Sequence, residues 1–183
     1  MHLAFLVITA ILSLTTFDPR CAAGPSKLVS GRAVGETTPP FPVLDVTGPH
    51  QGKTICYVCE SGEAPVVFAF FRQTGDEMAS LLKQLDQLAR QNKDLIVVVV
   101  MTEGPNSQAW LKKFAQDNAI AIPLTVLRKG TEDVAMKLYK LNPSARNTIL
   151  VNVKRRVTAN LVDVSTENFK MVTSAAAKVL AQQ

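Results

Sequence analysis

The chain has 183 residues, of which 47% are hydrophobic, and a formal net charge of +5. Its Lys and Arg residues are scattered, with 154–156 as the one tight basic cluster, and aromatic residues make up 6%. This pattern does not favour nucleic-acid binding, which uses a basic face interleaved with aromatic side chains. No Gly-rich phosphate loop or nucleophile elbow supports nucleotide or acyl-transfer chemistry.

The first segment of interest is the apolar run 3–14, which is too short to span a bilayer as a helix. Small residues follow at Cys21, Ala22 and Ala23, so we predict a secretory signal peptide over residues 1–23. The region before the run carries His2 but no Lys or Arg, which leaves an uncleaved anchor as the alternative. Cleavage after Ala23 removes 23 of the 183 residues, leaves 160 and predicts a secreted or periplasmic protein with no remaining membrane segment.

The mature chain is long enough for one domain with a hydrophobic core. Residues 24–40 are rich in Gly, Pro, Ser and Thr, and we expect a poorly ordered, flexible N-terminal arm. The domain itself is predicted over residues 41–183.

Apolar runs and helical spacing predict alternating strands and helices along this domain. Strands without polar interruption are predicted at 64–72 and 94–101. Amphipathic helices are expected near 75–92, from a cap at Asn106 or Ser107 to about 118, at 131–139 with Thr131 as cap, and at 166–180. Further strands are predicted at 123–127, 148–153 and 157–162, the last two as an antiparallel hairpin. Together they predict an α/β fold with a mixed central sheet and helices on both faces.

The cysteines of the mature chain form one Cys-x-x-Cys pair, Cys56 and Cys59, placed before the strand at 64–72. In an oxidising compartment two thiols at this spacing pair with each other or hold a metal. As a redox centre, the pair has Glu60 and Glu63 nearby to raise a thiol pKa and Lys53 and His50 to lower it.

Two alternatives to the redox centre stay open at this point. With His50, the cysteines could supply three ligands for copper(I) or zinc, although a lone His in a turn is usually solvated. As a structural disulfide, the pair would stabilise the folded state by only about 2 kcal/mol or less, because the closed loop is so short. We predict Cys56 and Cys59 as the catalytic residues, with no metal and no cofactor.

The order of elements and the string 65–71 leading into a helix at Glu77 resemble the thioredoxin superfamily, in particular its redoxin branch of alkyl hydroperoxide reductase-like and TlpA-like proteins. The likeness is carried by residues 41–45, 64–88 and 133–157. It implies a thioredoxin-like fold and does not by itself assign an activity. As a hypothesis for Cys56 and Cys59, one thiolate attacks the disulfide of a protein partner and the other resolves the mixed disulfide, with no nucleotide cofactor.

Two departures from the redoxin pattern stand out. The turn that carries the reactive cysteines in this branch corresponds to residues 72–76, which contain no thiol, so the resemblance does not imply peroxidase activity. In this family a cis-proline lies just before the strand that faces the reactive turn. If that strand is 148–153, the proline position falls near Arg146 and no proline is present. If it is instead the strand after Ile122, Pro123 would occupy the position. We favour the first alignment and expect the cysteine pair at the opposite end of the first core strand.

Overall fold

The computed structural model describes residues 28–182, and the predicted leader over 1–23 lies outside these residues. A seven-stranded mixed sheet in the order β2-β1-β5-β4-β3-β6-β7 forms the centre. The strands are β1 (Val43–Asp45), β2 (Thr54–Ile55), β3 (Val66–Phe71), β4 (Ile96–Met101), β5 (Leu124–Val126), β6 (Asn147–Val153) and β7 (Arg156–Val162). The helices are α1 (Tyr57–Ser61), α2 (Asp76–Gln91), α3 (Gln108–Asp117), α4 (Val134–Leu138) and α5 (Lys170–Leu180), with short 3₁₀ turns η1 (Pro105–Ser107) and η2 (Gly130–Glu132).

The sheet is mixed because its two kinds of connection differ. Helical crossovers place β3, β4 and β5 parallel to one another, while β6 runs antiparallel to β3 and pairs with β7 in a hairpin. No helix within residues 28–182 is both long and apolar enough to cross a membrane. The mixed sheet and the helices between its strands confirm the predicted α/β architecture.

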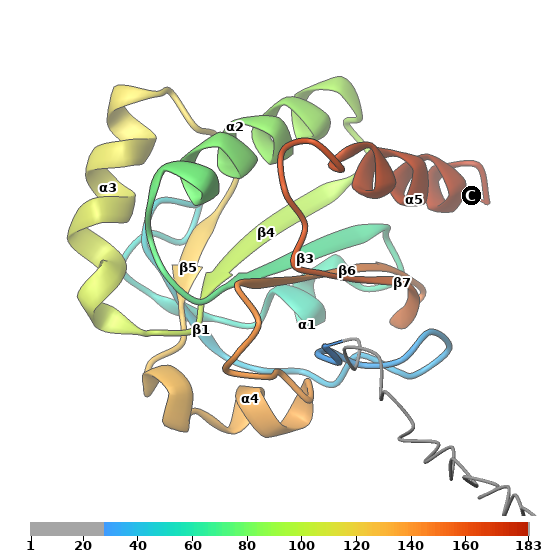
Figure 1. Ribbon diagram of the computed structural model, residues 1–183, viewed down its shortest axis with the longest axis horizontal. Helices are drawn as coiled ribbons and strands as arrows, with labels where there is room; N and C mark the ends of the chain where they lie inside the picture. Colours follow the sequence, from blue (N-terminus) through green and yellow to red (C-terminus); the bar gives the residue numbers. More distant parts are fainter. Residues whose placement is uncertain (1–27, 183) are drawn as a thin grey trace, which may run out of the picture.

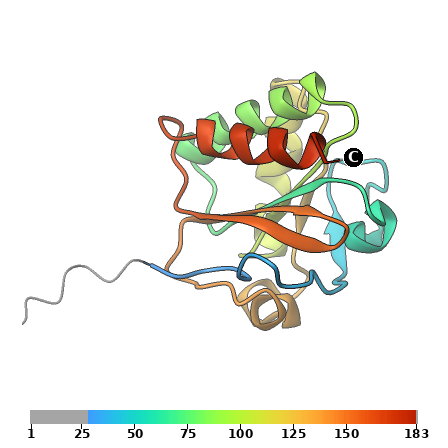
Figure 2. The same ribbon diagram turned by 90° about the vertical axis from the view of Figure 1, so that its right-hand side faces the viewer.

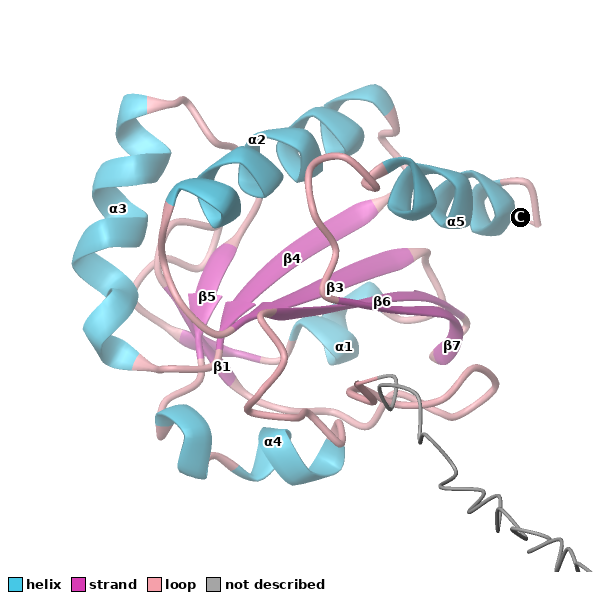
Figure 3. Ribbon diagram, viewed as in Figure 1, coloured by secondary structure: helices cyan, strands magenta, loops and turns pink. Residues whose placement is uncertain are grey.

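Helices cover both faces of the sheet (Figure 1). On one face, α2, α3 and α5 pack against every second residue of β3, namely Val67, Ala69 and Phe71. The other residues of β3, Val66, Phe68 and Phe70, point to the opposite face and meet α1 and α4. Figure 3 shows these two helices on the side of the sheet away from α2 and α5. All six residues of β3 are buried because both of its faces are covered.

The segment 28–40 differs from the poorly ordered arm that its composition indicates. It runs along the face of the sheet that also carries α4 (Figure 2). The hydroxyls of Ser30 and Thr148 share a 2.6 Å hydrogen bond, and Asn160 donates to the carbonyl oxygens of Ser30 and Arg32. These partners lie more than 100 residues away in the sequence, so the composition of the segment could not show them.

Most predicted elements are confirmed to within a few residues, with three local differences. The cap of α4 is Asp133, whose carboxylate accepts from the Ala135 N–H, because Thr131 belongs to the preceding 3₁₀ turn. Ser107 precedes α3 but makes no side-chain capping bond, and α5 begins at Lys170, later than predicted. Helix α1 was not predicted, and it carries the cysteine pair.

Candidate functional site

The cysteine pair lies at the start of α1 and forms a disulfide, with 5.3 Å between the Cα atoms. Cys56 is the N-cap residue, and its Sγ accepts a 3.2 Å hydrogen bond from the backbone N–H of Cys59. The same N–H also donates to the Cys56 carbonyl oxygen at 3.0 Å. Cys56 is half-buried, whereas Cys59 is exposed. The two cysteines of the disulfide therefore differ in exposure, and Cys59 is the more exposed.

The two residues between the cysteines anchor this helix to the sheet. Tyr57 and Val58 are buried and pack in the same cluster as Phe68 of β3. The helix ends at Ser61 because Gly62 adopts a positive φ of 58°, a conformation that glycine accepts without a Cβ clash. The chain then turns into β3. The Cys-x-x-Cys spacing thus places two apolar side chains inward and leaves the disulfide at the edge of the packed region.

A buried carboxylate, Asp45, ties α1 to the β1–β2 hairpin. Its Oδ2 accepts from the Tyr57 hydroxyl at 2.7 Å and from the His50 backbone N–H at 2.9 Å, and its Oδ1 accepts from the Gly48 N–H at 2.7 Å. The side chain has no exposed surface, so these donors replace the water that a carboxylate needs. Burial, followed by the bond to Asp45 and its negative charge, raises the pKa of Tyr57 well above its usual range.

Gly48 is required beside this carboxylate because of space. A Cβ at this position would lie 2.6 Å from Asp45 Oδ2 and 2.7 Å from the Tyr57 hydroxyl oxygen. Both distances are shorter than a carbon atom can approach. The turn that follows β1 therefore closes tightly over Asp45 and Tyr57, and it holds the start of α1 in place.

His50, the third candidate metal ligand, lies against α1 but binds another residue. Its Nε2 is 3.0 Å from a carboxylate oxygen of Glu60, and its ring meets the Tyr57 ring edge-on at 6.1 Å between centroids. Among residues 28–182, no group of three or more His, Cys, Asp or Glu side chains is arranged to hold a metal ion. With its sulfurs joined in a disulfide, the pair also lacks the thiolates that bind copper(I) or zinc.

The thiol-free turn 72–76 lies at the other end of β3. The cysteines precede β3. Between them and β3, the backbone carbonyl oxygen of Glu63 accepts a hydrogen bond from the backbone N–H of Lys154 in the β6–β7 turn. The turn 72–76 follows Phe71, the last residue of β3. A six-residue strand separates its two ends by about 16 Å. The predicted placement of the disulfide at the opposite pole from Thr74 and Gly75 is therefore what the structure shows.

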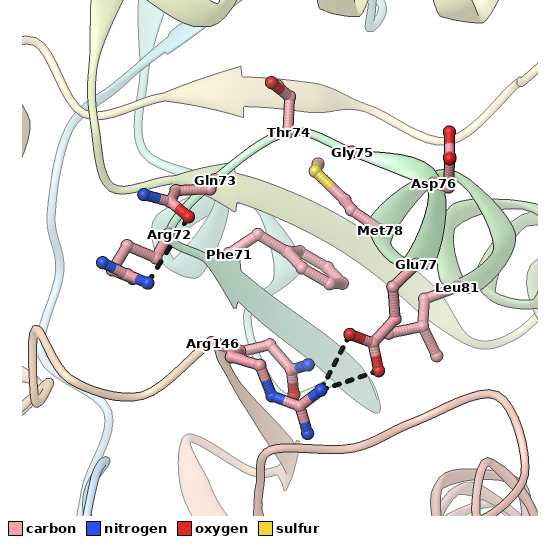
Figure 4. Close-up of a pocket in the computed structure, with 11 residues that line it drawn as sticks. Phe71, Arg72, Gln73, Thr74, Gly75, Asp76, Glu77, Met78, Leu81 and Arg146 are labelled. Carbon is pink, nitrogen blue, oxygen red and sulfur yellow. Dashed lines mark hydrogen bonds and ion pairs between the residues drawn. The ribbon is translucent and has the colours of Figure 1, made fainter.

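A cavity of about 190 Å³ occupies the turn at this second pole (Figure 4). Phe71, Met78 and Leu81 form its apolar part. On its rim, Nη1 of Arg146 contacts both carboxylate oxygens of Glu77 at 3.0 and 2.8 Å. The cavity holds charged and apolar side chains but no sulfur nucleophile, so this pole cannot carry out thiol exchange.

The pairing of β3 decides which strand faces this turn. The Arg72 N–H donates to the carbonyl oxygen of Arg146, just before β6, and β6 pairs with β3 along its whole length. Pro123 precedes β5, which is parallel to β4 and not adjacent to β3. The strand that faces this turn is therefore β6, and Arg146 lies directly before it. Every peptide bond between residues 28 and 182 is trans.

Comparison with known proteins gives structural neighbours only. No protein-family model matches the chain, and no curated protein matches it in sequence. A protein from Chlorobium tepidum assigned as thiol:disulfide interchange protein DsbE has 15% identity and a TM-score of 0.66, covering 81% of this chain and 98% of its own. Peroxidoxin BcpB from Mycobacterium tuberculosis has 19% identity and a TM-score of 0.65, with 82% and 97% covered.

A secreted disulfide oxidoreductase from Mycobacterium tuberculosis, homologous to Escherichia coli DsbE, is also similar. It has 13% identity and a TM-score of 0.59, with 75% of this chain and 95% of the other covered. These neighbours are thioredoxin-like redoxins. At such low identity the similarity establishes a shared fold, and the function of this chain has to be argued from its own residues.

The sequence pointed to Cys56 and Cys59 but gave little sign of Asp45 and Tyr57. Asp45 ends a short strand, and an acidic residue there reads as part of a turn. Tyr57 and Val58 are two apolar residues in a helix of only five, too short to show helical periodicity. The contact between Asp45 and Tyr57, twelve positions apart, forms only because the hairpin turns back over α1 in the folded chain.

Proposed function

We propose that this protein is an exported thiol-disulfide exchange protein that acts through Cys56 and Cys59. The observation that carries the proposal is the Cys56–Cys59 disulfide, in which Cys59 is exposed to solvent and Cys56 is half-buried. A partner can approach the exposed cysteine, and the second cysteine is already positioned to resolve a mixed disulfide. The thioredoxin-like fold supports the proposal by analogy alone.

The exchange needs no cofactor. In the reduced protein, one cysteine thiolate attacks a partner disulfide, forms a mixed disulfide and releases one partner thiolate. The second cysteine then attacks the mixed disulfide, so the protein becomes oxidised and the partner carries two thiols. Two electrons pass to the partner, and the reverse sequence oxidises a dithiol partner. The substrate class is a protein thiol or disulfide.

A second candidate function is binding without exchange, with the disulfide as a structural element. The packing of Cys56 against the apolar cluster around Phe68 favours this alternative. The two candidates differ in reduction potential. Structural disulfides of exported proteins have potentials below about −300 mV, whereas exchanging disulfides lie between about −270 and −120 mV.

The experiment that tests the proposal is a titration of the purified mature protein against glutathione redox buffers, followed by mass spectrometry of the alkylated protein. We expect the couple to equilibrate with the buffer. A couple that stays oxidised throughout would reject exchange and favour the binding protein. Native mass spectrometry of the same sample tests the metal alternative, because a stoichiometric zinc or copper adduct would support it.

Catalysis is tested by a variant in which Cys56 and Cys59 are both Ser. It should lose disulfide reductase activity toward a protein disulfide such as insulin while it remains folded by circular dichroism. The matched control is Arg146→Ala, at the other pole, which should keep that activity. Reductase activity that survives in the double variant would overturn the proposal.

Export is part of the proposal and rests on the leader predicted over residues 1–23. Oxidising compartments maintain disulfides, so a secreted or periplasmic location suits the Cys56–Cys59 bond. N-terminal sequencing of the protein from the extracellular or periplasmic fraction should begin at Gly24. A protein that keeps its leader and stays with the membrane would support the uncleaved anchor instead.

A further inference from the structure

The two sulfurs of the disulfide have different surroundings, which bears on their roles in the exchange proposed above. Cys59 is exposed, on the outer side of α1. Cys56 is half-buried and packs, with Ile55 and Ile96, against the apolar cluster around Phe68. A thiolate has to reach the sulfur that it attacks, so the more exposed cysteine, Cys59, offers the easier path.

The hydrogen bonds point to the same division of roles. The Cys59 backbone N–H donates to Cys56 Sγ, and this donor is held in place by the first turn of α1. A hydrogen bond to the charged form of a thiol favours that form. When the S–S bond breaks, a thiolate on Cys56 therefore has a donor already in position. Because this donor stabilises the Cys56 thiolate, Cys56 is the better leaving group of the two.

We infer that Cys59 is the sulfur that exchanges with the partner and that Cys56 is the internal, resolving sulfur. This inference rests on the proposed function. In the oxidised protein, a partner thiolate attacks Cys59 Sγ. A new bond forms between the partner sulfur and Cys59 Sγ, the Cys56–Cys59 bond breaks, and its electron pair goes to Cys56 Sγ as a thiolate. A second partner thiolate then attacks the partner sulfur of the mixed disulfide and releases Cys59 as a thiolate.

The reverse direction uses the same intermediate, because forward and reverse exchange pass through the same states. Cys59 as a thiolate attacks the partner disulfide, and one partner sulfur leaves as a thiolate. Cys56 then attacks Cys59 Sγ of the mixed disulfide, and the second partner sulfur leaves. The C-terminal cysteine of the pair thus contacts the partner in both directions, while the N-terminal cysteine contacts only Cys59.

The Asp45 network fixes this asymmetry in place. Tyr57, which directly follows Cys56, is buried and bonded to Asp45, so α1 cannot rotate to expose Cys56 without breaking that bond. Glu60, which follows Cys59, reaches back to His50 on the hairpin. Both ends of the short helix are therefore attached to the β1–β2 hairpin, and the exposed side remains the side of Cys59.

The inference is tested first on the wild-type protein. The oxidised protein is mixed with reduced glutathione, quenched in acid after short times and analysed by mass spectrometry. Fragmentation between Tyr57 and Val58 assigns the glutathione adduct to one cysteine. We expect the adduct on Cys59 in at least tenfold excess over Cys56. An adduct on Cys56, or equal amounts on both, would overturn the inference.

Single variants give a second readout. Cys56→Ser and Cys59→Ser are reacted with oxidised glutathione at pH about 9.5, where a thiol of ordinary pKa near 8.5 is mostly thiolate, so that access dominates the rate. We expect Cys56→Ser, which keeps Cys59, to react at least tenfold faster. Serine is a good N-cap residue, so this variant keeps the start of α1.

The two variants also separate the inference from the proposed function. A faster reaction of Cys59→Ser than of Cys56→Ser, in a wild-type protein that equilibrates with glutathione, would reject the assignment of roles and leave exchange intact. A wild-type disulfide that neither equilibrates nor forms any adduct would reject exchange itself, and the assignment would fall with it.

Discussion

The hydroxyl of Tyr57 donates a 2.7 Å hydrogen bond to Oδ2 of Asp45, which has no exposed surface. The bond joins the helix that carries the disulfide to the first strand of the sheet. Because the acceptor is a buried carboxylate, removal of the donor leaves a charged oxygen with one fewer partner in a region that water does not reach.

Replacement of Tyr57 by Phe should therefore lower the free energy of unfolding by about 1.5–3 kcal/mol, the range for a hydrogen bond to a charged group. Urea unfolding measures the change. Tyr139→Phe is the matched control, since its hydroxyl donates to the neutral carbonyl oxygen of Pro39 and should cost about 1 kcal/mol. If Tyr57→Phe costs no more than Tyr139→Phe, Asp45 does not depend on this donor.

The two tyrosines of the chain should remain protonated in the folded protein above pH 10. Burial raises the pKa of Tyr139, and burial together with Asp45 raises the pKa of Tyr57. Unfolded tyrosine ionises near pH 10, so their contribution to stability is complete below pH 10 and is lost as the pH rises further. Tyrosinate absorbance should appear only with the loss of the circular dichroism signal. Its appearance near pH 10 in a still folded protein would contradict the burial of both hydroxyls.

Gly31 and Gly35 offer a matched test of the packing of segment 28–40. Both have positive φ, 87° and 89°, so Ala at either position strains the backbone by about 1 kcal/mol. A Cβ at Gly31 would also lie 2.7 Å from Thr148 Cγ2, whereas at Gly35 nothing lies within 4 Å. Gly31→Ala should therefore cost about 1–3 kcal/mol more in urea unfolding. Equal costs would show that the segment does not pack on the sheet.

Replacement of Arg146 by Ala should leave the rate of glutathione exchange unchanged, because the disulfide lies at the other end of β3. The Arg146–Glu77 ion pair is half exposed, so its loss should lower stability by at most about 1 kcal/mol. The exchange assay of the wild-type protein measures the first effect, and urea unfolding measures the second. A clear fall in exchange rate would assign a part in the reaction to the cavity beside residues 72–76.

Reduction of the Cys56–Cys59 disulfide should leave the protein folded. A loop closed over a separation of three residues restricts the unfolded chain little, so reduction should lower the free energy of unfolding by about 2 kcal/mol or less. Urea unfolding with and without a thiol reductant measures this. A loss of several kcal/mol would indicate that the disulfide is needed for the fold, which favours the structural role.

The sequence by itself determined the main elements and their order. The uninterrupted apolar run of β3 and the spacing of Leu81, Leu85 and Leu88 in α2 each depend on residues close together in the chain. Burial on both faces of a strand and on one face of a helix imposes these patterns directly. The Cys-x-x-Cys pair was equally visible, because two thiols three positions apart can meet without any long-range contact.

Only the tertiary structure decided how the candidate site is arranged. Asp45 meets Tyr57 because a hairpin folds back over α1. Ser30 meets Thr148 because the segment 28–40 lies along the face of the sheet in which β6 takes its place 118 residues later. Neither contact leaves a periodic pattern in the sequence. The unequal exposure of Cys56 and Cys59 likewise follows from the seating of α1 by Tyr57 and Val58 on the core, since a five-residue helix takes its orientation from what it packs against.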